Sequence, residues 1–412
     1  MRFSYLNGNI NQLFSGMRSL LFAFLGFLRF WQRLFRRMSG KTTDDISTQR
    51  ITTGKAWDEF CDRLKLAGSV LQYPGTPRDA LQQAEGIRYL TRLTRAALEA
   101  FVEYNDPAFP VFRRMVHETV KMGADNPDNH YFNAQISGQF EYRIWGKRNS
   151  IHYLGFFTQY GNYGTTGGMA PCGKIEDSGL ILEDDGSFEI ILSREPKGKN
   201  WLKTEEDTSL VIVRQTFLDH AHEVPAEFVI ENLDGRKHPE PLSPVALDEG
   251  LKTASLFVAG APLLFARWAH GFKKHPNTLP LFDPEVSNSA GGDASILYHH
   301  SYWKLDPDEA LVIKVKPPAC DSWNFQLNNY WMESLDYRYF TISVNKAEAS
   351  YAADGSVQVV VAHKDPGLPN WINTCGHREG TMCWRWYRLK NGESPVEPSC
   401  KVMKLSDIVD NL

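Results

Sequence analysis

Three sequence markers occur twice in this chain, in the same order, and this repeat restricts the possible folds more than any other feature. Asp-Gly-Ser, Asn-Trp and a later arginine begin at 185, 200 and 214 in the first copy. They return at 354, 370 and 385, displaced by 169, 170 and 171 residues. Surface loops accommodate single insertions readily. The spacing therefore predicts one structural module that is present twice.

Both copies have the pattern of antiparallel β-structure. Short apolar runs such as ALVIKV (310–315) lie between turn residues, and EYRIWG (141–146) alternates apolar and polar side chains. Asp-Gly is a common hairpin pair, and the tryptophan of Asn-Trp can close the edge of a core. We expect Arg214 and Arg385 to pair with a carboxylate or with backbone carbonyls, as part of the scaffold. The predicted fold class is mainly β with helical layers (α+β), with two tandem antiparallel β-sandwich or jelly-roll modules related by internal duplication.

The remaining segments predict helices around the two modules. Thr76 and Pro77 have the types expected of a cap and a first helical residue, and a shorter helix is expected over 110–121. A connecting helix is expected to start at Ser243-Pro244 and to kink at Pro262. The predicted segments are an amphipathic N-terminal helix and linker (1–50), a helical layer (51–124), the first β module (125–240), a connecting helix (241–285) and the second β module (286–412).

Residues 10–38 have the pattern of an amphipathic helix. Arginines 18, 29, 33, 36 and 37 fall on one polar arc of a helical projection, and Leu, Phe, Met and Trp cover most of the rest. The apolar run 20–28 is shorter than the roughly 20 residues that cross a bilayer. We therefore predict a helix in the plane of a membrane surface and a cytoplasmic protein with peripheral membrane association. A helix docked on the protein or a partner, and a targeting segment, are the alternatives. Residues 39–53 are polar and predict a linker.

Composition and motifs exclude several classes of function. The formal net charge of −4 provides no basic footprint, so we expect no nucleic-acid partner. None of the six cysteines forms a CxxC pair, which favours free thiols in a reducing compartment. The chain has no Walker loop, no GxGxxG after a strand, no GxSxG and no HExxH. We predict no cofactor and no metal site, and the sequence does not fix the oligomeric state.

The second copy contains the most distinctive amino-acid sequence. It reads WNFQLNNYWMESLDYR (323–338), SVN (343–345) and DGSVQVVVAHKDPGLPNWINTCGHREGTMCWRW (354–386). This text resembles the uncharacterised family known as domain of unknown function 1214, most strongly over 291–386. The first copy, with GKNWL (198–202) and VIVRQTF (211–217), is similar to its often-fused neighbour family, number 1254. The resemblance implies a β-sandwich protein and implies no established reaction.

One predicted strand of the second copy presents a row of amides. Asn324, Gln326 and Asn328 alternate with apolar residues and so share a face, with Tyr330 next along. If that face is buried, the amides need partners, which a polar ligand, a water network or loop backbone can supply. We predict ligand-binding roles for a set of residues around this strand and the second Asn-Trp loop: Asn324, Gln326, Asn328, Tyr330, Trp371 and His377.

The polar residues near the second Asn-Trp loop differ from those of the first copy, which is where a specialised site can arise. His363, for example, corresponds to Arg194. We predict His363 as a general base oriented by Asp365, with Arg338 as a third catalytic residue beside Asp336. Loop capping by these side chains is the alternative.

The leading functional hypothesis is a membrane-associated protein that binds, and transforms, a small or lipidic molecule at the second module. The expected partners are therefore that ligand and a membrane surface contacted through residues 10–38. A carbohydrate-binding module and a non-catalytic membrane-surface assembly protein are the alternatives. The sequence does not distinguish an enzyme from a binding protein.

Overall fold

The computed structural model describes residues 42–409, so the predicted interfacial helix over 10–38 lies outside the described residues. The described chain forms two units, one of residues 42–57 and 242–248 and one of residues 58–241 and 249–409. In the first unit, α2 (Thr43–Thr52) begins with a capping box between Thr42 and Asp45. Buried Ser47 and Arg50 both bond to Asp248. These contacts stabilise a helix of polar sequence, and the linker predicted over 39–53 is wrong where α2 forms.

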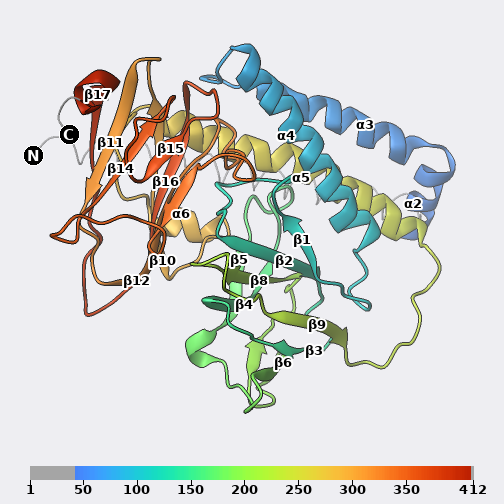
Figure 1. Ribbon diagram of the computed structural model, residues 1–412. Helices are drawn as coiled ribbons and strands as arrows, with labels where there is room; N and C mark the ends of the chain where they lie inside the picture. Colours follow the sequence, from blue (N-terminus) through green and yellow to red (C-terminus); the bar gives the residue numbers. More distant parts are fainter. Residues whose placement is uncertain (1–41, 410–412) are drawn as a thin grey trace, which may run out of the picture. The chain divides into compact units, whose positions relative to one another are not determined.

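Further helices precede, connect and follow the two modules (Figure 1). The second helix of the early layer starts later than predicted, because Asp79 and not Thr76 is the cap: its carboxylate accepts from the backbone N–H of Gln82 at 3.0 Å. The helical elements are α3 (Lys55–Ala67), η1 (Gly68–Gln72), α4 (Ala80–Leu98), the π-helical turn η2 (Glu99–Glu103), η3 (Asp177–Gly179), α5 (Pro244–Phe272), α6 (Pro284–Ser289) and α7 (Leu405–Val409).

The first module consists of two sheets, in the orders β1-β2-β8-β4-β5 and β7-β6-β3-β9. Their facing sides enclose one apolar core, to which Ile144, Phe156 and Val213 contribute. The strands are β1 (Arg113–Val116), β2 (Asn129–Gln135), β3 (Tyr142–Lys147), β4 (Tyr153–Tyr160), β5 (Ala170–Glu176), β6 (Ser187–Ser193), β7 (Trp201–Lys203), β8 (Leu210–Thr216) and β9 (Glu227–Asn232).

The second module repeats this arrangement with the sheet orders β10-β16-β12-β13 and β15-β14-β11-β17. Its core contains stacked Trp323 and Trp384, whose ring centroids are 4.9 Å apart. Its strands are β10 (Ile296–Lys304), β11 (Glu309–Val315), β12 (Cys320–Leu327), β13 (Ser343–Asn345), β14 (Val357–Ala362), β15 (Trp371–Asn373), β16 (Glu379–Leu389) and β17 (Ser399–Lys404).

The repeated sequence markers occupy equivalent places in the two modules. The side-chain amide of Asn200 donates to the carbonyls of Ile181 and Glu189, and that of Asn370 donates to those of Ser350 and Gln358. The indole N–H groups of both tryptophans bond a carbonyl of the neighbouring strand at 3.1 Å. Both Asp-Gly turns have a glycine at positive φ, 78° and 79°. The fold is therefore the predicted mainly β fold with two repeated modules.

The structure contradicts one helix expected next to the modules and confirms where another begins. The helix predicted over 110–121 is wrong, because residues 113–116 form β1 and pair with the edge of β2. The connecting helix α5 begins at Pro244 as predicted and contains Pro262. From Leu251 onward, α5 buries the side chains of residues such as Ala254 and Phe257.

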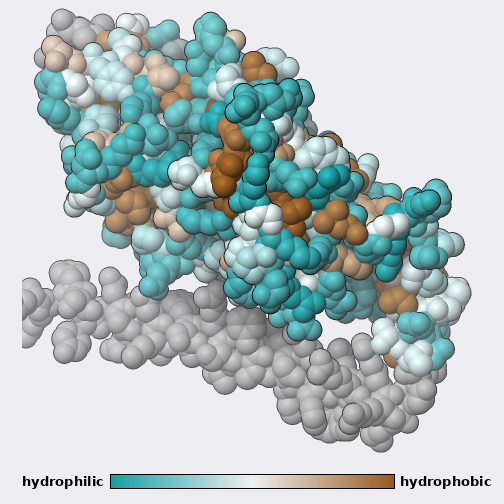
Figure 2. All heavy atoms as spheres, turned by 90° about the horizontal axis from the view of Figure 1, so that it is seen from below, coloured by the Kyte–Doolittle hydropathy of each residue, from teal (hydrophilic) through white to brown (hydrophobic). Residues whose placement is uncertain are grey.

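The surface of the described residues is mixed in character. On the face seen in Figure 2, hydrophobic residues appear in separate groups among hydrophilic ones. None of the helices within residues 42–409 combines the length and the apolar composition that crossing a bilayer requires.

Candidate functional site: a cavity between the two modules

A cavity of about 340 Å³ lies between the modules, and its first wall is the outer face of sheet β1-β2-β8-β4-β5. Alternate residues of β8 point to opposite sides of this sheet. Ile212 and Arg214 line the cavity, whereas Val211 and Val213 belong to the core. Strand β2 adds a polar row to the same wall, consisting of Asn129, Tyr131, Asn133 and Gln135.

The second wall is the corresponding outer face of sheet β10-β16-β12-β13. Arg385 and Tyr387 of β16 line the cavity, whereas Trp384 and Trp386 between and before them are in the second core. Strand β10 contributes Ile296, Tyr298 and His300. Each wall of the cavity is thus the reverse side of a sheet that already holds a module core.

Helix α5 and the loop 161–169 complete the enclosure. Phe257 and Phe265 of the helix line the cavity, as do Tyr163 and Met169 of the loop. The two backbones approach closely at Gly260, where a Cβ atom would lie 2.3 Å from the carbonyl oxygen of Tyr163. Only a residue without a side chain allows this approach.

The duplication places an equivalent tyrosine–arginine pair on each wall. Tyr131 is the cross-strand neighbour of Arg214, and Tyr298 is the cross-strand neighbour of Arg385. The two arginines are the late repeat markers, which the sequence assigned to the scaffold. Their predicted pairing with a carboxylate or with carbonyl groups is confirmed, and both also line the cavity.

Arg214 has a counter-charge. Its guanidinium donates to the carbonyl of Gly291 at 2.6 Å and lies 3.5 Å from an oxygen of Asp293. Both side chains of this ion pair are largely buried, so the attraction is weakly screened by solvent. The positive charge of Arg214 is therefore balanced within the fold.

Arg385 is held by neutral acceptors. Its guanidinium donates to Gln326 Oε1 at 2.6 Å, to Asn324 Oδ1 at 3.3 Å and to the carbonyl of Ala124. The residue is only 3% exposed, and within residues 42–409 it has no carboxylate oxygen within the 4.0 Å of an ion pair. A buried charge without a partner is costly unless something else compensates it.

The row of amides lies one layer behind the cavity. Asn324, Gln326 and Asn328 are buried, and none of them lines it. Asn324 also donates to the side chain of Asn126, and Gln326 donates to the carbonyl of Asp125. The partners expected for buried amides are a polar ligand, a water network or loop backbone. In the structure Asn324 and Gln326 bond residues of the loop 124–128 and, in addition, Arg385. Asn324 and Gln326 position the guanidinium of Arg385, and the predicted contact of the three amides with a ligand stays a prediction.

Burial controls the ionisation of the cavity wall. It lowers the pKa of His300 to about 3 and raises that of Tyr298 to about 12, because each group loses the hydration of its charged form. His300 lies between the rings of Phe272 and Tyr298, nearly parallel to both. At neutral pH the imidazole and the phenol are therefore both uncharged.

The residues predicted to be catalytic make separate local contacts. His363 Nδ1 bonds Thr374 Oγ1 at 2.8 Å, and Asp365 accepts from the backbone N–H of Gly367. Arg338 forms a two-bond pair with Asp336, at 2.9 and 2.7 Å. No hydrogen bond or ion pair joins His363, Asp365 and Arg338 in the part of the chain that the structure describes. Their catalytic roles stay predictions.

The remaining predicted ligand residues are also placed outside the cavity. Tyr330 is fully buried, and its hydroxyl lies 3.5 Å from the carbonyl of Ala266. Trp371 bonds the backbone, as described above. His377 lines a separate pocket of about 160 Å³ and lies 3.9 Å from Glu85, while burial lowers its pKa. Between residues 42 and 409, no group of three His, Cys, Asp or Glu side chains is arranged to hold a metal ion.

Sequence reasoning missed most of the cavity wall. Arg214 and Arg385 can be recognised as equivalent from the sequence, since they recur at nearly the same offset as the other markers. Tyr131 and Tyr298 are 167 residues apart, which departs from the offsets of 169 to 171 residues that the other markers share. Their equivalence follows from strand register, which the sequence does not show directly.

Comparison with known proteins agrees with this architecture. The family described as "Protein of unknown function (DUF1214)" matches residues 168–217 and 303–391, which fall in both modules. The likeness of the first copy to family 1254 stays a prediction. No curated protein matches the chain.

Solved structures similar to this chain include two crystal structures of bacterial proteins. One is an uncharacterized protein from Burkholderia cenocepacia, with 49% sequence identity and a TM-score of 0.85, covering 87% of this chain and 99% of that one. The other is the VPA0106 protein from Vibrio parahaemolyticus, with 13% identity and a TM-score of 0.43, covering 83% and 100%. The family match and the extensive similarity to the Burkholderia protein lead to one conclusion: the chain belongs to the DUF1214 family of proteins of unknown function.

Proposed function

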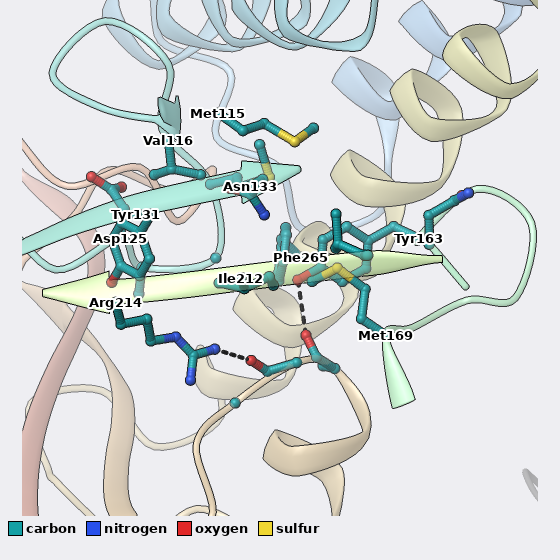
Figure 3. Close-up of a pocket in the computed structure, with 18 of the residues that line it drawn as sticks. Met115, Val116, Asp125, Tyr131, Asn133, Tyr163, Met169, Ile212, Arg214 and Phe265 are labelled. Carbon is teal, nitrogen blue, oxygen red and sulfur yellow. Dashed lines mark hydrogen bonds between the residues drawn. The ribbon is translucent and has the colours of Figure 1, made fainter. Parts of the chain in front are cut away.

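We propose that this protein binds a small, largely apolar molecule with one polar end in the cavity between its modules. The supporting observation is the division of the cavity lining. Figure 3 shows Arg214, Tyr131 and Asp125 at one end and Phe265 and Met169 at the other. The volume of about 340 Å³ is within the range of roughly 300 to 1,000 Å³ that is usual for ligand pockets.

The proposed place differs from the one that the sequence suggested. The site uses both modules, and residues of the predicted amide row take part by holding Arg385. The proposal concerns binding. A reaction by His363, Asp365 and Arg338 is not part of it, because no described contact brings these side chains together.

The alternatives receive less support. Carbohydrate-binding surfaces are expected to present a flat exposed row of rings, whereas Tyr131, Tyr163 and Tyr298 line the concave wall of a cavity. A purely structural assembly protein would have its polar groups paired internally and no sizeable pocket. The amides are paired in that way, but the cavity is a feature that this alternative does not require.

Mass spectrometry of copurifying small molecules tests the proposal. We expect the full-length protein to carry a ligand that is lost in Ile212→Trp, since the larger ring would occupy the cavity beside Arg214. Ile212→Val is the matched control, because it leaves the space open, and it should keep the ligand. Melting curves check that both variants fold. Absence of any ligand from the wild type, or equal recovery from all three proteins, would contradict the proposal.

We also propose that residues 10–38 attach the protein to a membrane surface, which supplies an apolar ligand by partition. The arginine-lined arc of that segment supports this part. Deleting residues 1–40 is expected to move the protein from the membrane fraction to the soluble fraction after cell lysis. An unchanged distribution would remove membrane attachment from the proposal and leave ligand binding intact.

A further inference from the structure

Resting on the proposed binding function, we infer that the polar end of the ligand is a carboxylate, held by Arg385 and by the tyrosine hydroxyl groups around it. The argument depends on two properties of the cavity. Its buried charges leave one positive charge unbalanced, and several of its polar groups are donors without acceptors.

The charge argument compares the buried ionic groups at the cavity. Arg214 is balanced by Asp293. Asp125 lines the cavity, and buried Lys121 donates to the carbonyl of Ser334, the residue whose N–H and hydroxyl groups donate to Asp125. Arg385 also acts on Asp125, whose carboxylate oxygens already accept from Ser334. Buried Asp128 lies outside the cavity lining, 3.6 Å from the ring of His220. Counting Arg214 with Asp293, Lys121 with Asp125 and His220 with Asp128 leaves the charge of Arg385, which a single negative charge would balance.

The second property is an excess of unused donors. A guanidinium has five N–H bonds. Arg385 uses three of these in its bonds to Asn324, Gln326 and Ala124, so two remain. A carboxylate, with two oxygens and no hydrogen, is suited to accept such a pair.

Three tyrosine hydroxyl groups on the cavity wall accept hydrogen bonds and donate none to the described residues. Tyr131 accepts from the backbone of Asn126 and the side chain of Asn129. Tyr387 accepts from the side chain of Asn126, at 2.7 Å. Tyr298 accepts from the backbone of Asp293. Each phenolic hydrogen is thus available to a ligand that only accepts.

His300 adds a polar atom without adding charge. The residue is 5% exposed, and its Nδ1 has no hydrogen-bond partner in the described chain. A neutral imidazole can donate one hydrogen bond to a carboxylate. An ammonium head group would be repelled by Arg385, and an alcohol would leave its charge unbalanced. A phosphate monoester has more than one negative charge near neutral pH, so it exceeds what Arg385 alone balances.

Calorimetric titration of the full-length protein at pH 7 with decanoate, decanol, decylamine and decyl phosphate tests this inference. We expect decanoate to bind at least about tenfold more tightly than any of the other three, as charge-assisted hydrogen bonds in a buried site would give. Arg385→Gln should weaken decanoate by about tenfold or more and leave decanol unchanged. Arg92→Gln is the control, since Arg92 is also a largely buried arginine but forms an ion pair with Glu333 and lines the other pocket.

Two further variants keep the test decisive if Arg385→Gln fails to fold. Arg385→Lys retains the positive charge but loses the paired N–H groups of the guanidinium. Tyr387→Phe removes only a hydroxyl group. Both should weaken decanoate more than decanol. If decanol binds as tightly as decanoate, the carboxylate assignment is wrong and the proposed binding function remains. Tighter binding of decyl phosphate overturns the carboxylate, and absence of binding by all four probes overturns both proposals.

Discussion

Replacing Gly260 by alanine is expected to destabilise the protein by about 3 kcal/mol, although alanine normally stabilises the interior of a helix. The new Cβ would lie 2.3 Å from the carbonyl oxygen of Tyr163 and 3.0 Å from the Cα atom of Gly164. Both neighbours are backbone atoms, so no side-chain rotation can relieve the overlap. Helix α5 and the loop 161–169 must then separate, which should also open the cavity and weaken ligand binding.

Gly271 in the same helix is the matched control for this experiment. A Cβ atom at this position would have no heavy atom within 4 Å. Gly271→Ala should therefore leave stability unchanged or raise it by up to about 1 kcal/mol. Urea unfolding followed by tryptophan fluorescence measures both variants. Equal effects at the two positions would show that the close approach at Gly260 does not limit stability.

His300 is expected to make the protein sensitive to acid. Its pKa is lowered from an ordinary value of 6.5 to about 3 in the folded state, so between these values the unfolded chain binds a proton that the folded chain does not. Folding stability must therefore fall as the pH decreases from about 6.5 towards 3. Between pH 7 and pH 4.5 the part due to His300 is roughly 2 to 3 kcal/mol.

The variant His300→Phe removes this group and keeps a ring between Phe272 and Tyr298. We expect its free energy of unfolding to fall by roughly 2 to 3 kcal/mol less than that of the wild type over the same pH range. His130, whose pKa burial lowers to about 4, contributes equally to both proteins and so cancels. His222→Phe, at a largely exposed position, serves as the control. The same pH dependence in wild type and His300→Phe would contradict the assignment.

The sequence was a reliable guide to the modules because their markers perform local tasks. Asn200 and Asn370 hold loops to adjacent strands, and the Asp-Gly turns require a glycine at positive φ. Such requirements depend on a few neighbouring residues, so they leave a readable pattern. The helix predicted over 110–121 is wrong for the opposite reason. Strand β1 forms there by pairing with β2, and helical propensity does not account for such a tertiary contact.

The cavity could not be predicted in the same way. Its walls are the outer faces of two sheets, and the polar residues there follow from strand register across the duplication. The sequence pattern shows the amide row as an unusual feature. The structure explains its burial by the hydrogen bond that it accepts from Arg385. No sequence pattern indicates that a side chain 59 residues away is the partner of Gln326. Spatial neighbours of this kind emerge only from the assembled sheets.

The two equivalent arginines have different partners, and this difference affects how a ligand could be oriented in the cavity. Two identical modules placed face to face would form a site that accepts a ligand in either of two opposite poses. Here Asp293 neutralises Arg214 and leaves Arg385 unmatched. Joining the copies in one chain allowed them to diverge independently. A ligand of the proposed kind, with a single charged end, would therefore have one orientation in the cavity.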